Sequence, residues 1–110
     1  MKRGEVRWYN FVKPDKKRPV VILTRDSIIE FLGEVTVAPV TYIIRDIPSE
    51  VLLSVNDGIP KSCTINLDHI QTVSKQKIGS LITTLSSEKM IELHSALLFA
   101  LGFKTSYKDF

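Results

Sequence analysis

The chain of 110 residues is long enough for one domain that buries a core without help from disulfides or metal ions. Its 44% apolar and 25% charged residues are typical of a soluble globular protein, and its single cysteine, Cys63, excludes an intramolecular disulfide and a cysteine-based metal site. Because Lys2 and Arg3 lead into an alternating pattern and not into an apolar run, we expect no signal peptide, no membrane contact and a cytoplasmic protein.

The charge is unevenly distributed, although the net charge is only +3. Residues 1–25 contain eight lysines and arginines against two carboxylates, and the rest of the chain is net negative. This asymmetry favours an anionic partner that meets the N-terminal third of the chain, with nucleic acid as the first candidate.

The first two elements are predicted to be the strands of a hairpin. Residues 4–12 alternate in hydropathy, which predicts a strand with Val6 and Trp8 pointing inward. Residues 13–16 have the composition of a turn, and the β-branched apolar run at residues 20–24 predicts a buried strand. A short basic connection would therefore join the two strands.

Lys16, Lys17, Arg18 and Pro19 stand at the entrance of this buried strand. Pro19 has a fixed φ angle and no N–H, so we expect it to be the first residue of the strand and to orient Arg18. A guanidinium beside two lysines is suited to binding phosphate. The alternative is a solvated basic turn that binds no ligand.

Several short elements follow, and turn residues separate them. Pro39 predicts that its strand lies at an edge or bends near its end. The apolar alternation changes parity at Ile70 and Val73, which indicates a bulge or corner near Asp68 and His69. We expect strands at residues 35–40, 49–53, 63–67 and 80–84, helical turns at residues 28–31 and 74–79, and a glycine turn at residues 56–58.

One long helix is predicted near the end of the chain. Ser86 is a good N-cap, and Gly102 ends the helix. An apolar stripe lies between them, at Met90, Leu93, Leu97 and Leu101. Apolar residues on other sides of the helix suggest that a second subunit covers them. We expect a domain over residues 1–102 and a loosely ordered tail over residues 103–110.

Five or six short strands, tight turns and one C-terminal helix are typical of a small mainly β (α+β) fold. We predict an SH3-like, partly open β-barrel that the C-terminal helix caps. Such a fold does not assign a function by itself, because function depends on the residues of a site.

Four segments stand in a characteristic order. They are Lys2-Arg3-Gly4-Glu5-Val6, Arg18-Pro19 before an apolar strand, Pro39-Val40-Thr41 at the end of the next strand, and Asp68-His69-Ile70-Gln71-Thr72-Val73 before a Lys-Gln-Lys turn. Together with the leucine-rich terminal helix, this order resembles the MazF/PemK (Kid) family of type II toxins. That family consists of sequence-specific mRNA endoribonucleases, also called mRNA interferases, and the resemblance covers residues 2–102.

The resemblance implies a homodimeric SH3-like barrel that cleaves single-stranded mRNA without a metal ion or cofactor. The products would carry 2′,3′-cyclic phosphate and 5′-hydroxyl ends. By position, Arg18 would be the catalytic arginine and Thr41 the catalytic threonine. A cognate antitoxin would inhibit the toxin by laying a flexible acidic tail in the RNA groove. Residues 12–17 are shorter than the Gly-rich loop that helps family members to select RNA bases.

The chemistry of RNA cleavage is consistent with these two roles. Attack of a 2′-hydroxyl on the adjacent phosphate builds negative charge on the phosphoryl oxygens and on the departing 5′-oxygen. Arg18 can neutralise this charge while Thr41 donates a hydrogen bond to it. Arg18 is a poor general base, because deprotonating an arginine at pH 7 costs at least about 7 kcal/mol. The general base stays open, with His69 as one candidate.

Four further residues are candidates for contacts with the RNA backbone and bases. Lys16 and Lys17 would hold phosphates. Phe11 and Tyr42 would stack on bases, as single-strand binding requires, or would instead belong to the core or to a dimer interface.

Three polar residues are candidates for reading base edges. Ser49, Asp68 and Gln71 lie near segments that line the RNA groove in the family that the chain resembles. Asp68 is not expected to bind a metal ion, because only the adjacent His69 offers a second ligand.

The alternative function is a non-catalytic toxin or nucleic-acid-binding module on the same barrel, such as a toxin that poisons a topoisomerase through its C-terminal tail. The fold does not separate these two functions. Arg18 together with Thr41 favours the ribonuclease, since a topoisomerase-directed toxin would need neither residue.

Overall fold

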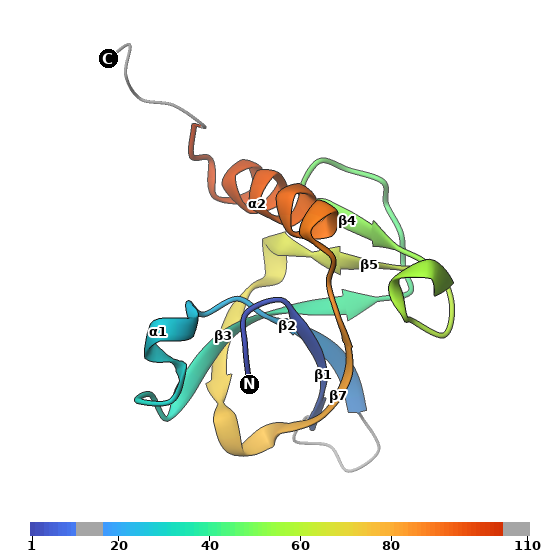
Figure 1. Cartoon of the computed structure of the whole chain (residues 1–110). Coiled ribbons are helices and arrows are strands. Elements are labelled where there is room, and N and C mark those ends of the chain that lie inside the picture. Colours follow the sequence, from blue (N-terminus) through green and yellow to red (C-terminus); the bar gives the residue numbers. More distant parts are fainter. Residues whose placement is uncertain (11–16, 105–110) are drawn as a thin grey trace.

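A curved antiparallel sheet and one long helix make up the fold (Figure 1). The structure is a computed structural model that describes residues 1–10 and 17–104. Its strands are β1 (Glu5–Asn10), β2 (Lys17–Ile22), β3 (Glu34–Thr41), β4 (Glu50–Leu53), β5 (Cys63–Asn66), β6 (Gln71–Ser74) and β7 (Ile78–Thr84). Its helices are α1 (Asp26–Ile29) and α2 (Ser87–Leu101), with single 3₁₀ turns η1 (Val55–Asp57), η2 (Leu67–His69) and η3 (Lys75–Lys77).

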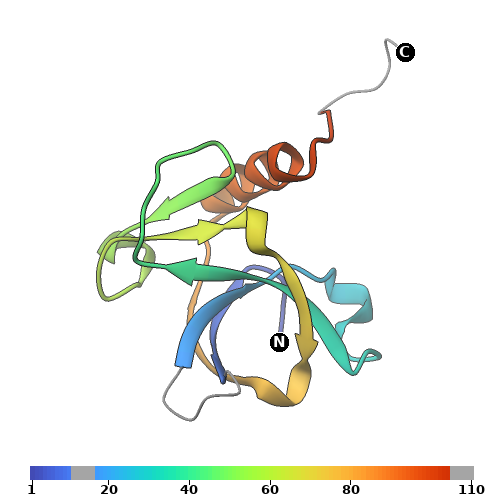
Figure 2. The ribbon, with the colours of Figure 1, turned by 180° about the vertical axis from the view of Figure 1, so that it is seen from behind.

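The strand order is β4-β5-β3-β2-β1-β7, and β6 pairs with β3 beside this path. The sheet bends round on itself without closing, and α2 packs on β4 and η2 (Figure 1). Seen from behind, β4 and β5 extend away from the ring that the other strands make (Figure 2). This architecture confirms the predicted mainly β, partly open barrel with a C-terminal helix.

The β1–β2 hairpin forms as predicted, but β2 begins earlier than expected. Its ladder extends to the pair Asn10 and Lys17, so Pro19 is the third residue of the strand and lies opposite Trp8. The prediction that Pro19 begins the strand was wrong, because β1 is long enough to pair with the two residues before it. The predicted turn at residues 13–16 lies outside the described residues.

Trp8 is only half-buried, although it was predicted to point inward with Val6. The strand has a core on each of its faces: Val6 belongs to one apolar cluster, and Tyr9 belongs to the other. The ladder between β1 and β7 shifts register between Arg7 and Tyr9. The alternation of inward and outward side chains therefore breaks near Trp8, and Tyr9 is buried instead of Trp8.

β3 is a central strand, which corrects the expectation that Pro39 would mark an edge. One side of β3 pairs with β2, and the other side pairs with β6 up to Val37 and with β5 from Val40 onward. Pro39 lies in the gap between the β6 and β5 ladders, where its missing N–H interrupts neither of them. The 3₁₀ turn η2 connects β5 to β6 where these two ladders are interrupted. It confirms the corner predicted near Asp68 and His69.

Two apolar clusters stabilise the sheet from its two faces. The cluster under α2 joins Val21 and Ala38 to Leu67, Leu93 and Ala96. The second cluster lies on the opposite face and is formed by Tyr9, Val20, Ile22, Ile29, Val35, Val37 and Val73. Since alternate residues of β2 and β3 contribute to each cluster, both faces fix the register of these two strands.

Cys63 belongs to the first cluster and is 0% exposed. Burial, and secondarily the charge of Asp57, raises the pKa of the Cys63 thiol. Cys63 is therefore a small core residue and not a reactive thiol.

The α2 helix has the predicted caps. Ser86 Oγ accepts a hydrogen bond from the Lys89 N–H, and Gly102 has the left-handed conformation, with φ of 76°. Among the described residues, no helix combines the length and apolar character that crossing a bilayer requires. Most of the tail predicted at residues 103–110 lies outside the described part of the chain.

Leu67→Ala is expected to lower the free energy of unfolding by about 2–5 kcal/mol, because Leu67 is fully buried at the η2 corner. Urea denaturation measures this loss. The matched control is Leu52→Ala on β4, where the side chain is exposed and the expected loss is below about 1 kcal/mol. Equal losses from the two substitutions would contradict the placement of Leu67 in the core.

Candidate active site

Arg18 and Thr41 lie on adjacent strands. The ladder between β2 and β3 places Val20 opposite Pro39. Continuing this register by two residues places Arg18 opposite Thr41, and opposite residues in a regular ladder have Cβ atoms about 4.5–5.5 Å apart. Both residues line one pocket, so the sheet brings together the two side chains that the sequence singled out.

The pocket has a volume of about 300 Å³ and lies where β3 ends. Its lining is formed by Arg18, Pro39, Val40, Thr41, Ile43, Arg45, Asn66, His69 and Gln71. Within the described part of the chain, this lining includes two arginines and no carboxylate. The pocket is therefore suited to an anion.

The guanidinium of Arg18 is exposed and makes no hydrogen bond or ion pair with the described residues. Arginine has five N–H donors in a rigid plane and stays charged at neutral pH. In a pocket without a carboxylate, these donors are available to a bound phosphate.

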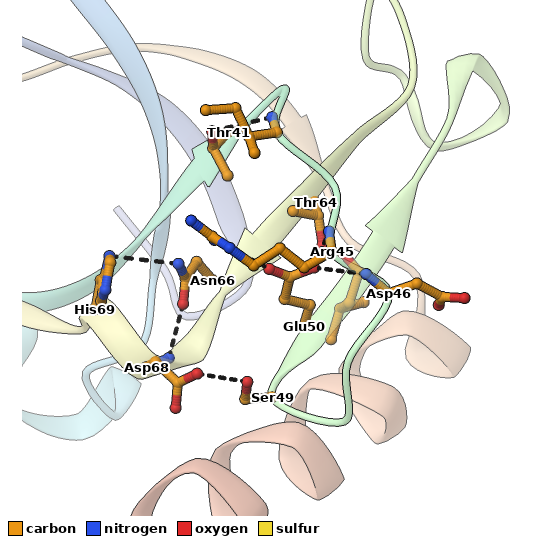
Figure 3. Close-up of polar contacts among 11 residues, drawn as sticks. Thr41, Arg45, Asp46, Ser49, Glu50, Thr64, Asn66, Asp68 and His69 are labelled. Carbon is orange, nitrogen blue, oxygen red and sulfur yellow. Dashed lines mark hydrogen bonds and ion pairs between the residues drawn. The ribbon is translucent and has the colours of Figure 1, made fainter.

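Thr41 is the last residue of β3 and is half-buried. Its Oγ1 accepts a hydrogen bond of 3.2 Å from the backbone N–H of Ile43, as Figure 3 shows. A hydroxyl that accepts from the backbone still has its own proton to donate. The turn after β3 thus fixes Thr41 while leaving it one donor for a ligand.

Arg45 is a pocket residue that the sequence analysis missed. It lies on the loop of residues 42–49, between β3 and β4, and Figure 3 shows its side chain extending from that loop over the sheet. The only signal in the sequence was an arginine four residues after Thr41, within a mostly apolar segment. Arg45 adds a second guanidinium to the pocket.

Glu50 holds this loop in place. Its Oε1 accepts hydrogen bonds from the backbone N–H groups of Arg45, at 3.0 Å, and Asp46, at 3.2 Å. Its Oε2 lies 3.6 Å from a guanidinium nitrogen of Arg45. The Glu50 side chain is only 1% exposed, so its buried charge would be costly without these partners. The hydrogen bond from the Asp46 N–H helps to hold Asp46 in a left-handed conformation, with φ of 55°.

Four polar residues form a hydrogen-bonded chain from Ser49, just before β4, to the pocket (Figure 3). Ser49 Oγ donates to Asp68 Oδ2, the Asp68 N–H donates to Asn66 Oδ1, and Asn66 Nδ2 lies 3.3 Å from His69 Nδ1. Ser49 is only 2% exposed, whereas Asp68 and His69 are exposed. Asp68 therefore presents polar atoms at the surface, and the buried Ser49 hydroxyl orients its carboxylate through a hydrogen bond.

The other sequence-predicted residues lie around this centre. Lys17 begins β2 next to Arg18 and is exposed, and Gln71 begins β6 and lines the pocket. Tyr42 is 49% exposed, which excludes it from the core, and the ammonium of Lys61 lies 4.3 Å from the centre of its ring. Phe11 and Lys16 lie outside the described residues.

No three His, Cys, Asp or Glu residues within the described ranges are arranged to hold a metal ion. The chemistry that this site offers with its own side chains is anion binding by Arg18 and Arg45 and hydrogen-bond donation by Thr41.

A model of the PemK-like, MazF-like toxins of type II toxin–antitoxin systems matches residues 2–101. The chain is 34% identical to a Mycobacterium tuberculosis protein named probable endoribonuclease MazF2, over 93% of this chain and 99% of that protein. It is 38% identical to another protein of that organism, named probable endoribonuclease MazF5, over 86% of this chain and 87% of that protein.

Solved structures have the same fold. The M. tuberculosis toxin MazF-mt6 superposes with a TM-score of 0.83 at 29% identity, covering 91% of this chain and 98% of that one. A mycobacterial endoribonuclease in complex with its cognate antitoxin superposes with a TM-score of 0.85 at 23% identity, covering 96% and 99% of the two chains.

Glu50→Ala is expected to release the loop of residues 42–49. Amide hydrogen exchange at Arg45 and Asp46 should accelerate, and the free energy of unfolding should fall by about 1–3 kcal/mol, because two N–H groups lose their acceptor. NMR-detected exchange and urea denaturation measure the two effects. Glu92→Ala, which removes an exposed carboxylate of α2, is the control and should change neither. Unchanged exchange at both amides would refute this role of Glu50.

Proposed function

The chain belongs to the PemK-like, MazF-like toxins of type II toxin–antitoxin systems, and we propose that it is an endoribonuclease that cleaves single-stranded mRNA at the Arg18–Thr41 pocket. The observation that carries this proposal is an unpartnered guanidinium opposite a threonine hydroxyl, in a pocket lined by no carboxylate of the described chain. The mRNA substrate places the action of the protein in the cytoplasm.

Cleavage follows from attack of the ribose 2′-oxygen on the adjacent phosphorus. The bond from phosphorus to the 5′-oxygen breaks, which leaves a 2′,3′-cyclic phosphate on one fragment and, after proton uptake, a 5′-hydroxyl on the other. Negative charge accumulates on the phosphoryl oxygens and the departing 5′-oxygen. Arg18 neutralises this charge, Thr41 donates its hydroxyl proton to a phosphoryl oxygen in a hydrogen bond, and no step requires a metal ion.

The residues around the pocket bind the flanking RNA. Lys17 and Arg45 neutralise neighbouring phosphates, and the exposed ring of Tyr42 stacks on a base with the face that Lys61 does not cover. Asp68 and Gln71 present exposed polar atoms to base edges, and Asp68 is oriented for this by Ser49. Phe11 and Lys16, which lie outside the described residues, are proposed to contact the RNA as well.

Arg18→Ala and Thr41→Ala are each expected to slow RNA cleavage by about 10²- to 10³-fold, since each removes a group that stabilises the developing charge. The assay uses a long, mostly unstructured RNA in EDTA, and the ends of the fragments are mapped. Cyclic phosphate at the 3′ ends of discrete fragments is the expected product of the wild type.

Lys77→Ala and Thr84→Ala are the matched controls, because both residues are exposed and neither lines the pocket. Both should retain activity close to that of the wild type. Intact RNA after incubation with concentrated wild-type protein would refute the proposal. Removal of residues 103–110 should leave cleavage intact, whereas a toxin that acts through its tail would lose its function.

We further propose that the chain is a homodimer whose RNA pocket is closed by a cognate antitoxin. The pocket's two arginines are complementary to an acidic antitoxin segment. The α2 helix buries Leu93 and Ala96 but leaves Leu101 half exposed beside a hollow of about 580 Å³, which apolar side chains line together with a few charged ones. A second copy of the chain covers this hollow in the proposal.

Leu101→Glu is expected to convert a dimer of the 12.5 kDa chain into a monomer, because it places a charge in the covered hollow. Sedimentation equilibrium measures the mass. Ile91→Glu, at an exposed position of the same helix that does not line the hollow, is the control and should remain dimeric. A monomeric wild type would refute the dimer.

A further inference from the structure

The imidazole of His69 is the pocket group to which the proposed function assigns no role. It lines the pocket together with Arg18 and Thr41. Its Nδ1 lies 3.3 Å from Asn66 Nδ2, and its Nε2 has no hydrogen-bond partner among the described residues. One ring nitrogen is thus held by the protein, while the other is available to a ligand.

The direction of this hydrogen bond follows from Asn66. The backbone N–H of Asp68 donates to Asn66 Oδ1 over 3.0 Å, and a backbone N–H has no lone pair with which to accept. This contact identifies the oxygen end of the amide, so the group that faces His69 is the NH₂, which only donates. His69 Nδ1 must therefore accept, and in this arrangement it carries no proton.

The burial of Asn66 makes this arrangement costly to reverse. Asn66 is only 5% exposed, so water does not replace a lost partner easily. Turning the amide round would bring its NH₂ against the Asp68 N–H. A proton on His69 Nδ1 would bring two donors together at the other end. A neutral His69 consequently carries its proton on Nε2.

We propose that Asn66 fixes His69 as a neutral imidazole with its proton on Nε2, and that this N–H binds a phosphate oxygen of the RNA beside Arg18 and Thr41. This inference rests on the proposed ribonuclease function. A nitrogen that already carries a proton does not take one from the 2′-hydroxyl. His69 is therefore an anion-binding residue and not the general base of the reaction.

The first experiment reads the tautomer in the free protein. Long-range ¹H–¹⁵N correlation spectra at neutral pH distinguish a proton on Nε2 from one on Nδ1, and the loss of one set of signals in His69→Gln separates His69 from His94. The expected result is the Nε2–H form for His69. A proton on Nδ1 in the wild type would overturn the proposal.

The second experiment separates hydrogen-bond donation from proton transfer. His69→Ala should reduce RNA cleavage about 10- to 100-fold, as expected for a lost hydrogen bond to a charged group. His69→Gln keeps an N–H donor but has no titrating nitrogen, so it should restore most of the activity. A glutamine variant as slow as the alanine variant would overturn the proposal, because it would require the proton chemistry of the imidazole.

Asn66→Asp is a nearly isosteric test of the positioning role. Its carboxylate accepts from both sides, so the neutral His69 should carry its proton on Nδ1 and leave Nε2 bare. Only the protonated imidazole would then donate from Nε2. Cleavage by this variant should fall as the pH rises and the imidazole loses its Nε2 proton, whereas the wild type keeps an Nε2–H and should show no such fall. Identical pH profiles for the two proteins would overturn the role of Asn66.

The other charged groups around His69 are Arg18 on β2, Arg45 on the loop after β3 and Asp68 on η2, and all three are present in both proteins. The difference between the profiles therefore reports on position 66. A wild type that does not cleave RNA would overturn the proposed function and the RNA contact with it. The spectrum of the free protein decides the tautomer separately.

Discussion

The register of β3 determines where each part of the pocket lies. On one side, the register of the ladder with β2 aligns Arg18 with Thr41 when it is continued two residues beyond the pair of Val20 and Pro39. On the other side, the ladder with β5 sets Thr41 opposite Thr64. A slip of one residue between β2 and β3 would turn Val20 and Ile22 from their apolar cluster to the other face. Fully buried apolar side chains therefore fix the positions of polar residues that they do not touch.

The irregular parts of the site depend on buried polar groups. The loop of residues 42–49 and the corner at η2 lie where the ladders of β3 stop, so these ladders do not hold them. Glu50 fixes the loop, and Asn66 and Ser49 fix the corner, each through hydrogen bonds made by a buried side chain. Buried polar groups are costly without partners, and here those partners are the segments that present Arg45 and His69.

The sequence was sufficient for the features that depend on neighbouring residues. Periodicity and caps located α2 between Ser86 and Gly102, and a parity change located the η2 corner. Arg18 and Thr41 were singled out together because the order of their segments resembles that of a known family. The central position of β3 in the sheet could not be predicted from the sequence, because Pro39 lies in a gap between two ladders that β3 forms with distant strands.

The misassigned side chains have a similar explanation. Arg45 belongs to the pocket because a buried carboxylate, five residues later, folds the loop back over the sheet, and no local pattern indicates this. Ser49 was expected to face the RNA, but its hydroxyl donates to Asp68 from a buried position. In both cases the outcome depends on a hydrogen bond that only the folded chain brings together.

The β4 strand lies at one end of the sheet, and among the described strands only β5 pairs with it. An edge of this kind is a template on which strands of other chains can add. Here the edge is four residues long, and Lys89 Nζ donates a hydrogen bond of 2.8 Å to the carbonyl of Leu52. A charged group that occupies one of the few open acceptors hinders the addition of a further strand. The α2 helix that packs on β4 thus also protects the chain against edge-to-edge aggregation.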